Sequence, residues 1–566
     1  MKKASALALR ILSQLCSVAA AAAPIAAAAS VVAGCADESD PKTWVKRLDD
    51  PAQRTPAIKR IKEMFDSAMG AANNNREDAK VKGIVDDSVE GLTKTYTAGS
   101  LDDKTRKDLI QLLADMGDPR AAPAYAKAFK DFEPGRNDED VKFAAQGTMR
   151  LSGAGKLQDQ GLIDALWDCF AKFQPSKAKS INLVKDLQAA VKTVKHDSYG
   201  PKAVALLAAP VDPKSPESMM DHVQFWQLTA AQLIGDTKFT PGVKPLVTAL
   251  MTPSKKDLIF PVRNALQKMP KEAEPVLIQA LKGEGDFAAQ AKGYPENAYV
   301  PLVAEPLAYI SRPAGKEAVL AALASATTDQ NRTMLATYLT YFPADAKLTR
   351  AFLDAYAKVN PSAAIAALGG ANGHAVLAGT AANFFDPSLT DWILREVAAA
   401  KGEAQFSLPA SALPAAIKLM GPEQAKAVEG AVNKIQGQAI EKDMFKSAHT
   451  VLDKCKKDVA CYLSVLDTPV PSAPPAAKMG HVKAVWMAGM LGDASTKPAL
   501  LDRVEKIKDG SVRLALLEAI DHLSPQGDTA AADKLEKLVE TDTAAGNKAG
   551  VDEMYRIALK LRSRVP

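Results

Sequence analysis

Aromatic residues are scarce in this chain of 566 residues, at 6% of the sequence, and alanine and leucine carry much of its 47% hydrophobic content. β-Sandwiches are rich in aromatic and β-branched residues, so the composition disfavours them and favours closely packed helices. A charged fraction of 24% beside that hydrophobic content excludes global disorder. The length exceeds one compact core, which indicates several domains or a repeat array.

The chain also lacks a large excess of charge of either sign. Its formal net charge is +5, and Lys2, Lys3 and Arg10 lie in a segment that we expect to be removed. Without these three the 71 basic residues become 68, against 66 acidic ones, a net charge of +2. Lysines alternate with acids along the predicted helices, so we expect solvated helix faces and no nucleic-acid partner.

Sequence motifs of catalysis and metal binding are missing. The six histidines are never three or four residues apart, and no HExxH, nucleophile-elbow or EF-hand pattern occurs. The glycine-rich segment 151–157 has Arg150 and Leu157 where a phosphate-binding loop needs glycine and Ser or Thr, so we interpret it as a helix-ending turn. We therefore predict no catalytic residue, no metal site and no small-molecule cofactor.

The N-terminus has a basic start, an apolar run without acids and small residues at its end, as in a secretory signal. Its last residues, Val32-Ala33-Gly34-Cys35, resemble the lipobox of bacterial lipoprotein signal peptides. The resemblance implies a signal peptide over residues 1–34, cleavage before Cys35, and lipidation of the Cys35 thiol and new amino group. Ala36 after the cysteine resembles the outer-membrane sorting pattern. A permanent transmembrane helix is the alternative, disfavoured by Pro24 within the run.

Three cysteines follow Cys35. Cys455 and Cys461 are six residues apart, about 9 Å along a continuous helix, which is too far for a disulfide. An oxidising compartment favours a bridge, so we predict a turn between them with Asp458 as the N-cap of the next helix. A metal site formed with His449 is the alternative. Cys169 is predicted to be a buried free thiol.

A helix-ending pattern recurs along the chain. Gly-Asp is followed by proline, six residues after the glycine, in residues 117–123 and 492–498, and a looser copy starts at Gly235-Asp236. A second pattern places valine and a basic residue at a helix start, at residues 141–142, 262–263, 482–483 and 512–513.

These residues resemble HEAT repeats and their short bacterial relatives, the PBS-lyase-type repeats. The resemblance implies that the glycine ends one helix, the aspartate caps the next, the proline lies in its first turn, and the basic residue pairs with an aspartate of a neighbouring repeat. It gives structural roles to Gly117, Asp118, Pro123, Gly235, Asp236, Arg263, Gly492, Asp493, Pro498, Asp509 and Arg513.

The predicted fold class is all-α, an α-solenoid of HEAT-like helical hairpins. We expect a lipidated N-terminus and short tether over residues 35–45, a repeat array over 46–400, and a C-terminal helical array over 401–566 with a proline-rich loop at 467–477. A joint is expected near residue 400 and a break in the array near 364–374. Each helix pair should contact mainly its neighbours.

A binding function follows from this architecture, because a solenoid presents a long surface suited to a protein or peptide partner. The lipid would hold it to a membrane of the cell envelope, on the periplasmic or the external face of the outer membrane. The alternatives are a lyase-type HEAT-like enzyme and an envelope component that binds glycan. Glycan binding needs exposed aromatic rings, whereas all five tryptophans lie in apolar helical patterns and are predicted to be core.

Overall fold

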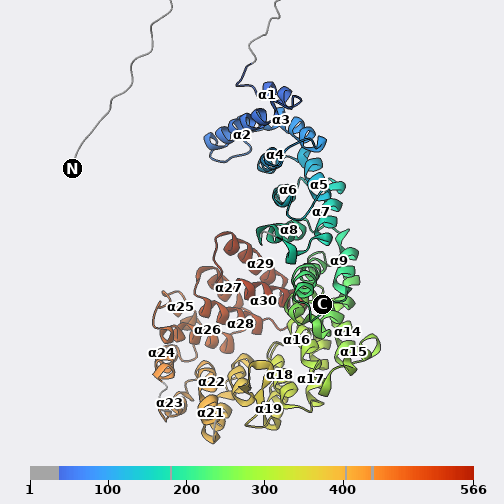
Figure 1. Cartoon of the computed structure of the whole chain (residues 1–566). Helices are drawn as coiled ribbons and strands as arrows, with labels where there is room; N and C mark the ends of the chain where they lie inside the picture. The colour runs from blue at the N-terminus through green and yellow to red at the C-terminus, as the bar shows by residue number, and fades with distance from the viewer. Residues whose placement is uncertain (1–36, 179–180, 402–403, 435–438, 566) are drawn as a thin grey trace, which may run out of the picture. The chain divides into compact units, whose positions relative to one another are not determined.

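The computed structural model describes residues 37–178, 181–401, 404–434 and 439–565, and most of these residues are helical (Figure 1). Their internal contacts divide the chain into two compact units, residues 1–95 and 96–566. In the first unit α1 (Pro41–Arg47) and α2 (Arg54–Ala71) precede α3 (Ala79–Ala98), which runs into the second unit. The apolar residues Ile58, Ile61 and Phe65 recur at helical spacing on α2 and are buried.

The second unit is an array of antiparallel helix pairs whose members alternate between two rows. Each helix of the first row contacts the next one in that row. The first row consists of α4 (Asp103–Met116), α6 (Asp138–Gly153), α8 (Ile181–Val194), α11 (Leu228–Asp236), α13 (Ile259–Gln267), α16 (Val300–Ile310), α18 (Asp329–Leu339), α20 (Gly373–Thr380), α22 (Ala404–Leu419), α24 (Ala439–Cys455), α26 (Met479–Leu491), α28 (Gly510–His522) and α30 (Val551–Ser563).

The second row is formed by the longer helices between these; the short helices α10 (Pro216–Ser218) and α15 (Ala288–Lys292) belong to neither row. It consists of α5 (Ala122–Lys130), α7 (Gln160–Lys172), α9 (Tyr199–Ala208), α12 (Val243–Leu250), α14 (Pro270–Leu281), α17 (Pro313–Ala324), α19 (Ala346–Lys358), α21 (Leu389–Ala399), α23 (Ala425–Lys434), α25 (Val459–Val465), α27 (Lys497–Lys506) and α29 (Thr529–Ala544). The two rows are the architecture of an α-solenoid, the predicted fold class.

Hydrogen bonds between neighbouring repeats show the repeat length directly. The amide of Gln188 on α8 donates to Thr229 on α11 at 3.1 Å, 41 residues later. Arg263 on α13 donates to Glu305 on α16 at 2.6 Å, 42 residues later. These separations lie within the length of a HEAT-like repeat, about 40–47 residues.

A short β-hairpin interrupts the helices within the segment where we expected a break in the array. Strands β1 (Ala364–Ile365) and β2 (Ala371–Asn372) pair antiparallel, Ile365 opposite Ala371. The sequence showed no strand, because two residues are too few to establish an alternating pattern. Asn372 then caps α20 by accepting from the Ala375 backbone N–H at 3.0 Å.

The last helix of the array packs back onto its middle. α30 contacts its neighbours α28 and α29 and also α13 and α16, which lie about half the unit earlier in the chain (Figure 1). Helices α16, α18, α20, α22, α26, α28 and α30 therefore form a closed ring in which each contacts the next and α30 meets α16. This contact is the exception to the expectation that helix pairs contact mainly their neighbours.

Within the described ranges, no helix combines the length and the apolar character that a membrane crossing requires.

Candidate functional site

Gly117 lies where the first Gly-Asp pattern placed it. It is the C-cap of α4 and has φ +65°, a left-handed conformation that glycine adopts without a Cβ clash. Asp118 accepts a hydrogen bond from the Arg120 backbone N–H at 2.9 Å and caps the 3₁₀ turn that precedes α5. Pro123 is the second residue of α5.

The C-terminal copy keeps the helix end and the proline but not the cap: Gly492 has an extended backbone with φ −81°, and the N-cap of α27 is Thr496, so the capping role implied for Asp493 is wrong. Gly492 is the C-cap of α26, and Pro498 is the second residue of α27. Asp493 accepts from the Ser495 backbone N–H at 2.8 Å. Asp509 caps α28 by accepting from the backbone N–H groups of Ser511 and Val512 at 3.0 and 3.2 Å.

The copy at Gly235-Asp236 differs, and the roles implied for its residues are wrong there. Gly235 lies inside α11 and Asp236 is its last residue. A Cβ on Gly235 would lie 2.6 Å from the Cα of Ala265, so the glycine is required for the close approach of α11 to α13. Asp236 forms an ion pair with Lys268, the residue directly after the next first-row helix, α13.

The two arginines of the valine–basic pattern, Arg513 and Arg263, both have acidic partners. The predicted aspartate is present for Arg513 and absent for Arg263. Arg513 is fully buried and pairs with Asp542 of α29 at 2.6 Å. Arg263 pairs with a glutamate, Glu305, instead of an aspartate. Glu305 lies on α16, and its longer side chain reaches the guanidinium across the first row.

The two lysines of the same pattern, Lys142 and Lys483, do not pair with an aspartate. Lys142 pairs with Glu139 of its own helix at 3.4 Å. Lys483 is fully buried and donates to the backbone oxygens of Lys418 and Met420 at 2.8 and 2.5 Å, at the end of α22. Burial holds the pKa of Lys483 well below its usual value. The negative end of the α22 dipole is what stabilises any positive charge there.

Cys455 and Cys461 form a disulfide with their Cα atoms 5.3 Å apart. α24 ends at Cys455, Lys456 has φ +52°, and Asp458 caps α25, so a turn separates the two helices. Cys169 is buried, and this burial raises the pKa of its thiol to about 12. Cys35 and the predicted signal peptide lie outside the described residues.

Three of the five tryptophans are core residues, and the prediction for the other two is wrong. Trp167, Trp226 and Trp486 are buried, whereas Trp44 and Trp392 are only half-buried. The guanidinium of Arg47 lies 4.1 Å from the centre of the Trp44 ring, and Tyr356 packs edge-on against Trp392.

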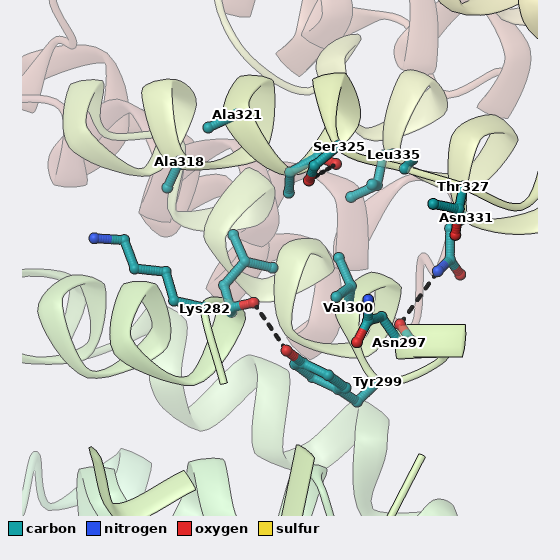
Figure 2. Close-up of a pocket in the computed structure, with 13 residues that line it drawn as sticks. Lys282, Asn297, Tyr299, Val300, Ala318, Ala321, Ser325, Thr327, Asn331 and Leu335 are labelled. Atoms are coloured by element: carbon teal, nitrogen blue, oxygen red, sulfur yellow. Dashed lines mark hydrogen bonds between the residues drawn. The ribbon is translucent and has the colours of Figure 1, made fainter. Parts of the chain in front are cut away.

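A pocket of about 310 Å³ lies where the chain between α14 and α16 approaches α17 and α18 (Figure 2). Ala318 and Ala321 of α17, with Ser325 directly after it, form one wall, and Tyr299 and Asn297 face it. The Asn331 amide donates to the Asn297 backbone oxygen at 3.2 Å and fixes the loop that bears it. The side chains that line the pocket are mostly small and apolar, and Lys282 lies at its edge.

A larger groove of about 530 Å³ crosses three successive first-row helices, α8, α11 and α13. Phe260 in this groove is 60% exposed, an unusual state for a phenylalanine. Lys192 and Lys195 also line the groove, and neither has an ion-pair partner among the described residues. The groove thus offers an aromatic ring and positive charge on a continuous surface.

The sequence matches no protein-family model and no curated protein. Among solved structures the chain is similar to importin beta, with 11% identity over 93% of this chain and 80% of that chain and a TM-score of 0.28. It is also similar to She4p, with 9% identity over 93% and 91% of the two chains and a TM-score of 0.21. An engineered protein has 15% identity over 93% and 98% and a TM-score of 0.17.

Three stacked aromatic side chains and a buried acid lie among the helices of the ring. The Phe385 ring lies 4.0 Å from that of Trp486 and 4.5 Å from that of His522. Glu518, one turn before His522 on α28, has no ion-pair partner among the described residues. Burial raises the pKa of Glu518 to about 6. In the described parts of the chain no group of three or more His, Cys, Asp or Glu side chains could hold a metal ion.

Glu518→Gln should stabilise the protein at neutral pH and not in acid. The folded-state pKa of about 6 exceeds the ordinary 4.5, so the protonated carboxyl stabilises the fold below pH 4.5, and this contribution is lost as the pH rises through 6. Glutamine removes the charge, and the gain at pH 7.5 is expected to be about 2 kcal/mol. Urea unfolding at pH 4.5 and 7.5 measures it, with Glu540→Gln on α29 as the exposed control. An equal effect at both pH values would contradict the assignment.

Proposed function

We propose that this protein is a membrane-anchored helical-repeat scaffold that binds a protein or peptide partner in the cell envelope and does not catalyse a reaction. The N-terminal lipobox-like sequence supports the anchor, because acylation at Cys35 would hold the array at a membrane. Ala36, directly after Cys35, supports a location at the outer membrane, because it resembles the outer-membrane sorting pattern. The two-row array supports the binding function, since successive helices place side chains in register along one surface.

The groove across α8, α11 and α13 carries the proposal. It extends over three repeats, so an extended segment of a partner can lie along it. Phe260 supplies apolar area and Lys192 and Lys195 supply charge, the combination that gives a protein interface both affinity and orientation. The described tryptophan rings are buried or covered by neighbours, which disfavours stacking against a glycan.

A photoreactive amino acid at position 260 should crosslink the full-length protein to its partner in native membranes. The matched control carries the same amino acid in place of Leu514, which is 42% exposed on α28 and lies outside the groove. Mass spectrometry should identify one protein enriched at position 260 over position 514. Lys192→Glu in the same background should reduce the yield, because it reverses a charge in the groove. Equal crosslinking at both positions would contradict the proposed site.

A further inference from the structure

The contact that closes the ring is made by the polar edge of α30. The Gln267 amide of α13 donates to the Arg556 backbone oxygen at 3.3 Å, across 289 residues. The Arg312 guanidinium donates to the Ser563 backbone oxygen at 2.6 Å. Arg564 donates to the Ser311 hydroxyl at 2.9 Å. These bonds join α30 and the residue after it to α13 and to the turn that follows α16.

The apolar face of α30 is buried. Met554, Ile557, Ala558 and Leu561 recur at helical spacing and are almost completely buried. The helices with which α30 makes its most extensive contact are α29 and α28. The hydrogen bonds and ring contacts to α13 and α16 come from a different set, Tyr555, Arg556, Ser563 and Arg564. The hydrogen bonds and cation–ring contacts that separation would break therefore belong to this second set of residues.

The Arg556 side chain lies against the rings of Tyr309 and Tyr341 at the centre of the contact, and we call the site formed by these two rings the arginine slot. The Arg556 guanidinium is 5.1 Å from the centre of the Tyr309 ring on α16 and 5.8 Å from that of Tyr341, just after α18. The two rings meet edge to face at 5.1 Å. Arg263 lies 4.1 Å from the Tyr309 ring and 4.8 Å from the exposed ring of Phe260. Rings and guanidinium groups therefore alternate from the groove to α30, a geometry in which each cation is attracted to a ring face.

Arg556 is not fully satisfied in this position. It forms a bidentate pair with Glu553 of its own helix, whose Oε2 accepts from Nε at 2.7 Å. Its Nη1 atom is buried and has no hydrogen-bond partner among the described residues. A buried donor without an acceptor costs free energy, so an arginine with a better placed acceptor can compete with Arg556 for the slot.

We propose that the surface formed by Gln267, Tyr309, Ser311, Arg312 and Tyr341 is a recognition site for an arginine-bearing protein segment, and that α30 covers it as an autoinhibitory contact. The inference rests on the proposed function and names the chemistry of the partner. The chain's own α30 is the argument for the occupant: it is a helix whose arginine fills the slot and whose backbone carbonyl groups accept from Gln267 and Arg312. A partner with the same features replaces α30 and opens the ring.

The test uses the full-length protein and a fluorescent peptide with the sequence of residues 551–565. In the wild type α30 competes for the site, so the apparent affinity is reduced by the fraction of molecules that are open. Arg556→Ala should bind the peptide at least about tenfold more tightly than the wild type, since it raises that fraction. The matched control is Arg562→Ala on the same helix, because Arg562 pairs with Asp533 and Glu536 of α29 and should leave binding unchanged.

Two further variants test the slot itself. Tyr309→Leu in the Arg556→Ala background should lose the gain in affinity, because it removes one ring of the slot. Arg556→Lys keeps the charge but not the planar group, and should give an intermediate affinity even if Arg556→Ala does not fold. Equal peptide binding by wild type, Arg556→Ala and Arg556→Lys, or indifference to Tyr309→Leu, would overturn the inference. Crosslinking at position 260 is independent of this peptide, so either proposal can fail alone.

Discussion

Asp542→Ala is expected to lower the free energy of unfolding by about 3–5 kcal/mol, because it leaves the buried Arg513 charge without its counterion. Arg513 has no exposed surface, Asp542 is 3% exposed, and the two form an ion pair at 2.6 Å. Arg513 would retain only its bonds to the Val504 and Ala549 backbone oxygens, at 3.0 and 2.8 Å. Urea-induced loss of helical circular dichroism measures the difference.

The control for this prediction is Asp502→Ala. Asp502 pairs with Lys534 between α27 and α29, but its side chain is 59% exposed. Removal of such a pair is expected to cost about 1 kcal/mol or less, since water screens it. If the two variants lost similar stability, burial of Arg513 could not be the reason for the larger effect.

Cys35→Ser is expected to abolish lipidation and signal cleavage. The thiol would accept the diacylglyceryl group, and cleavage before residue 35 depends on that modification in the lipoproteins that this N-terminus resembles. The variant should remain a precursor that retains residues 1–34 and carries no acyl chains. Intact-mass measurement of the membrane fraction gives both results at once.

Cys169→Ser is the matched control, because it makes the same exchange at a buried thiol. The mature mass of this variant should show the same acyl groups as the wild type. Normal processing of Cys35→Ser would refute the assignment of the N-terminus as a lipoprotein signal.

Local rules were sufficient to predict the helix ends of this array. Gly117, Asp118 and Pro123 act within one turn of the chain, through a left-handed φ, a side-chain cap and a fixed proline φ, and their roles do not depend on distant residues. The turn between Cys455 and Cys461 followed from the length of six helical residues. Gly235 was misassigned because a close approach between helices leaves the same glycine in the sequence as a helix end.

The candidate surfaces could not be predicted because they depend on contacts between repeats. Arg556 and Tyr309 are far apart in the chain, and neither belongs to a motif. Phe260 lies in an apolar helical pattern, yet it is 60% exposed and lines the groove. Glu518 is one of many acids on helices, and its burial, which raises its pKa, depends on the helices packed around it. The one sequence signal was the arginine-rich end, with Arg556, Arg562 and Arg564 in the last residues.

The closing contact of α30 also bears on how the array folds. In an open solenoid each repeat depends on its nearest neighbours, so folding can start anywhere and unfolding can stop at any interface. The bond between Gln267 and Arg556 instead spans 289 residues and can form only after every repeat between them has folded. It joins the two ends of the segment from α13 to α30, so loss of one repeat in that segment also breaks the contact at its ends. The repeats before α13 lie outside this segment, so the stability of each still depends on its nearest neighbours. The chain therefore contains a cooperative folding block at its C-terminal end, next to repeats that can unfold one at a time.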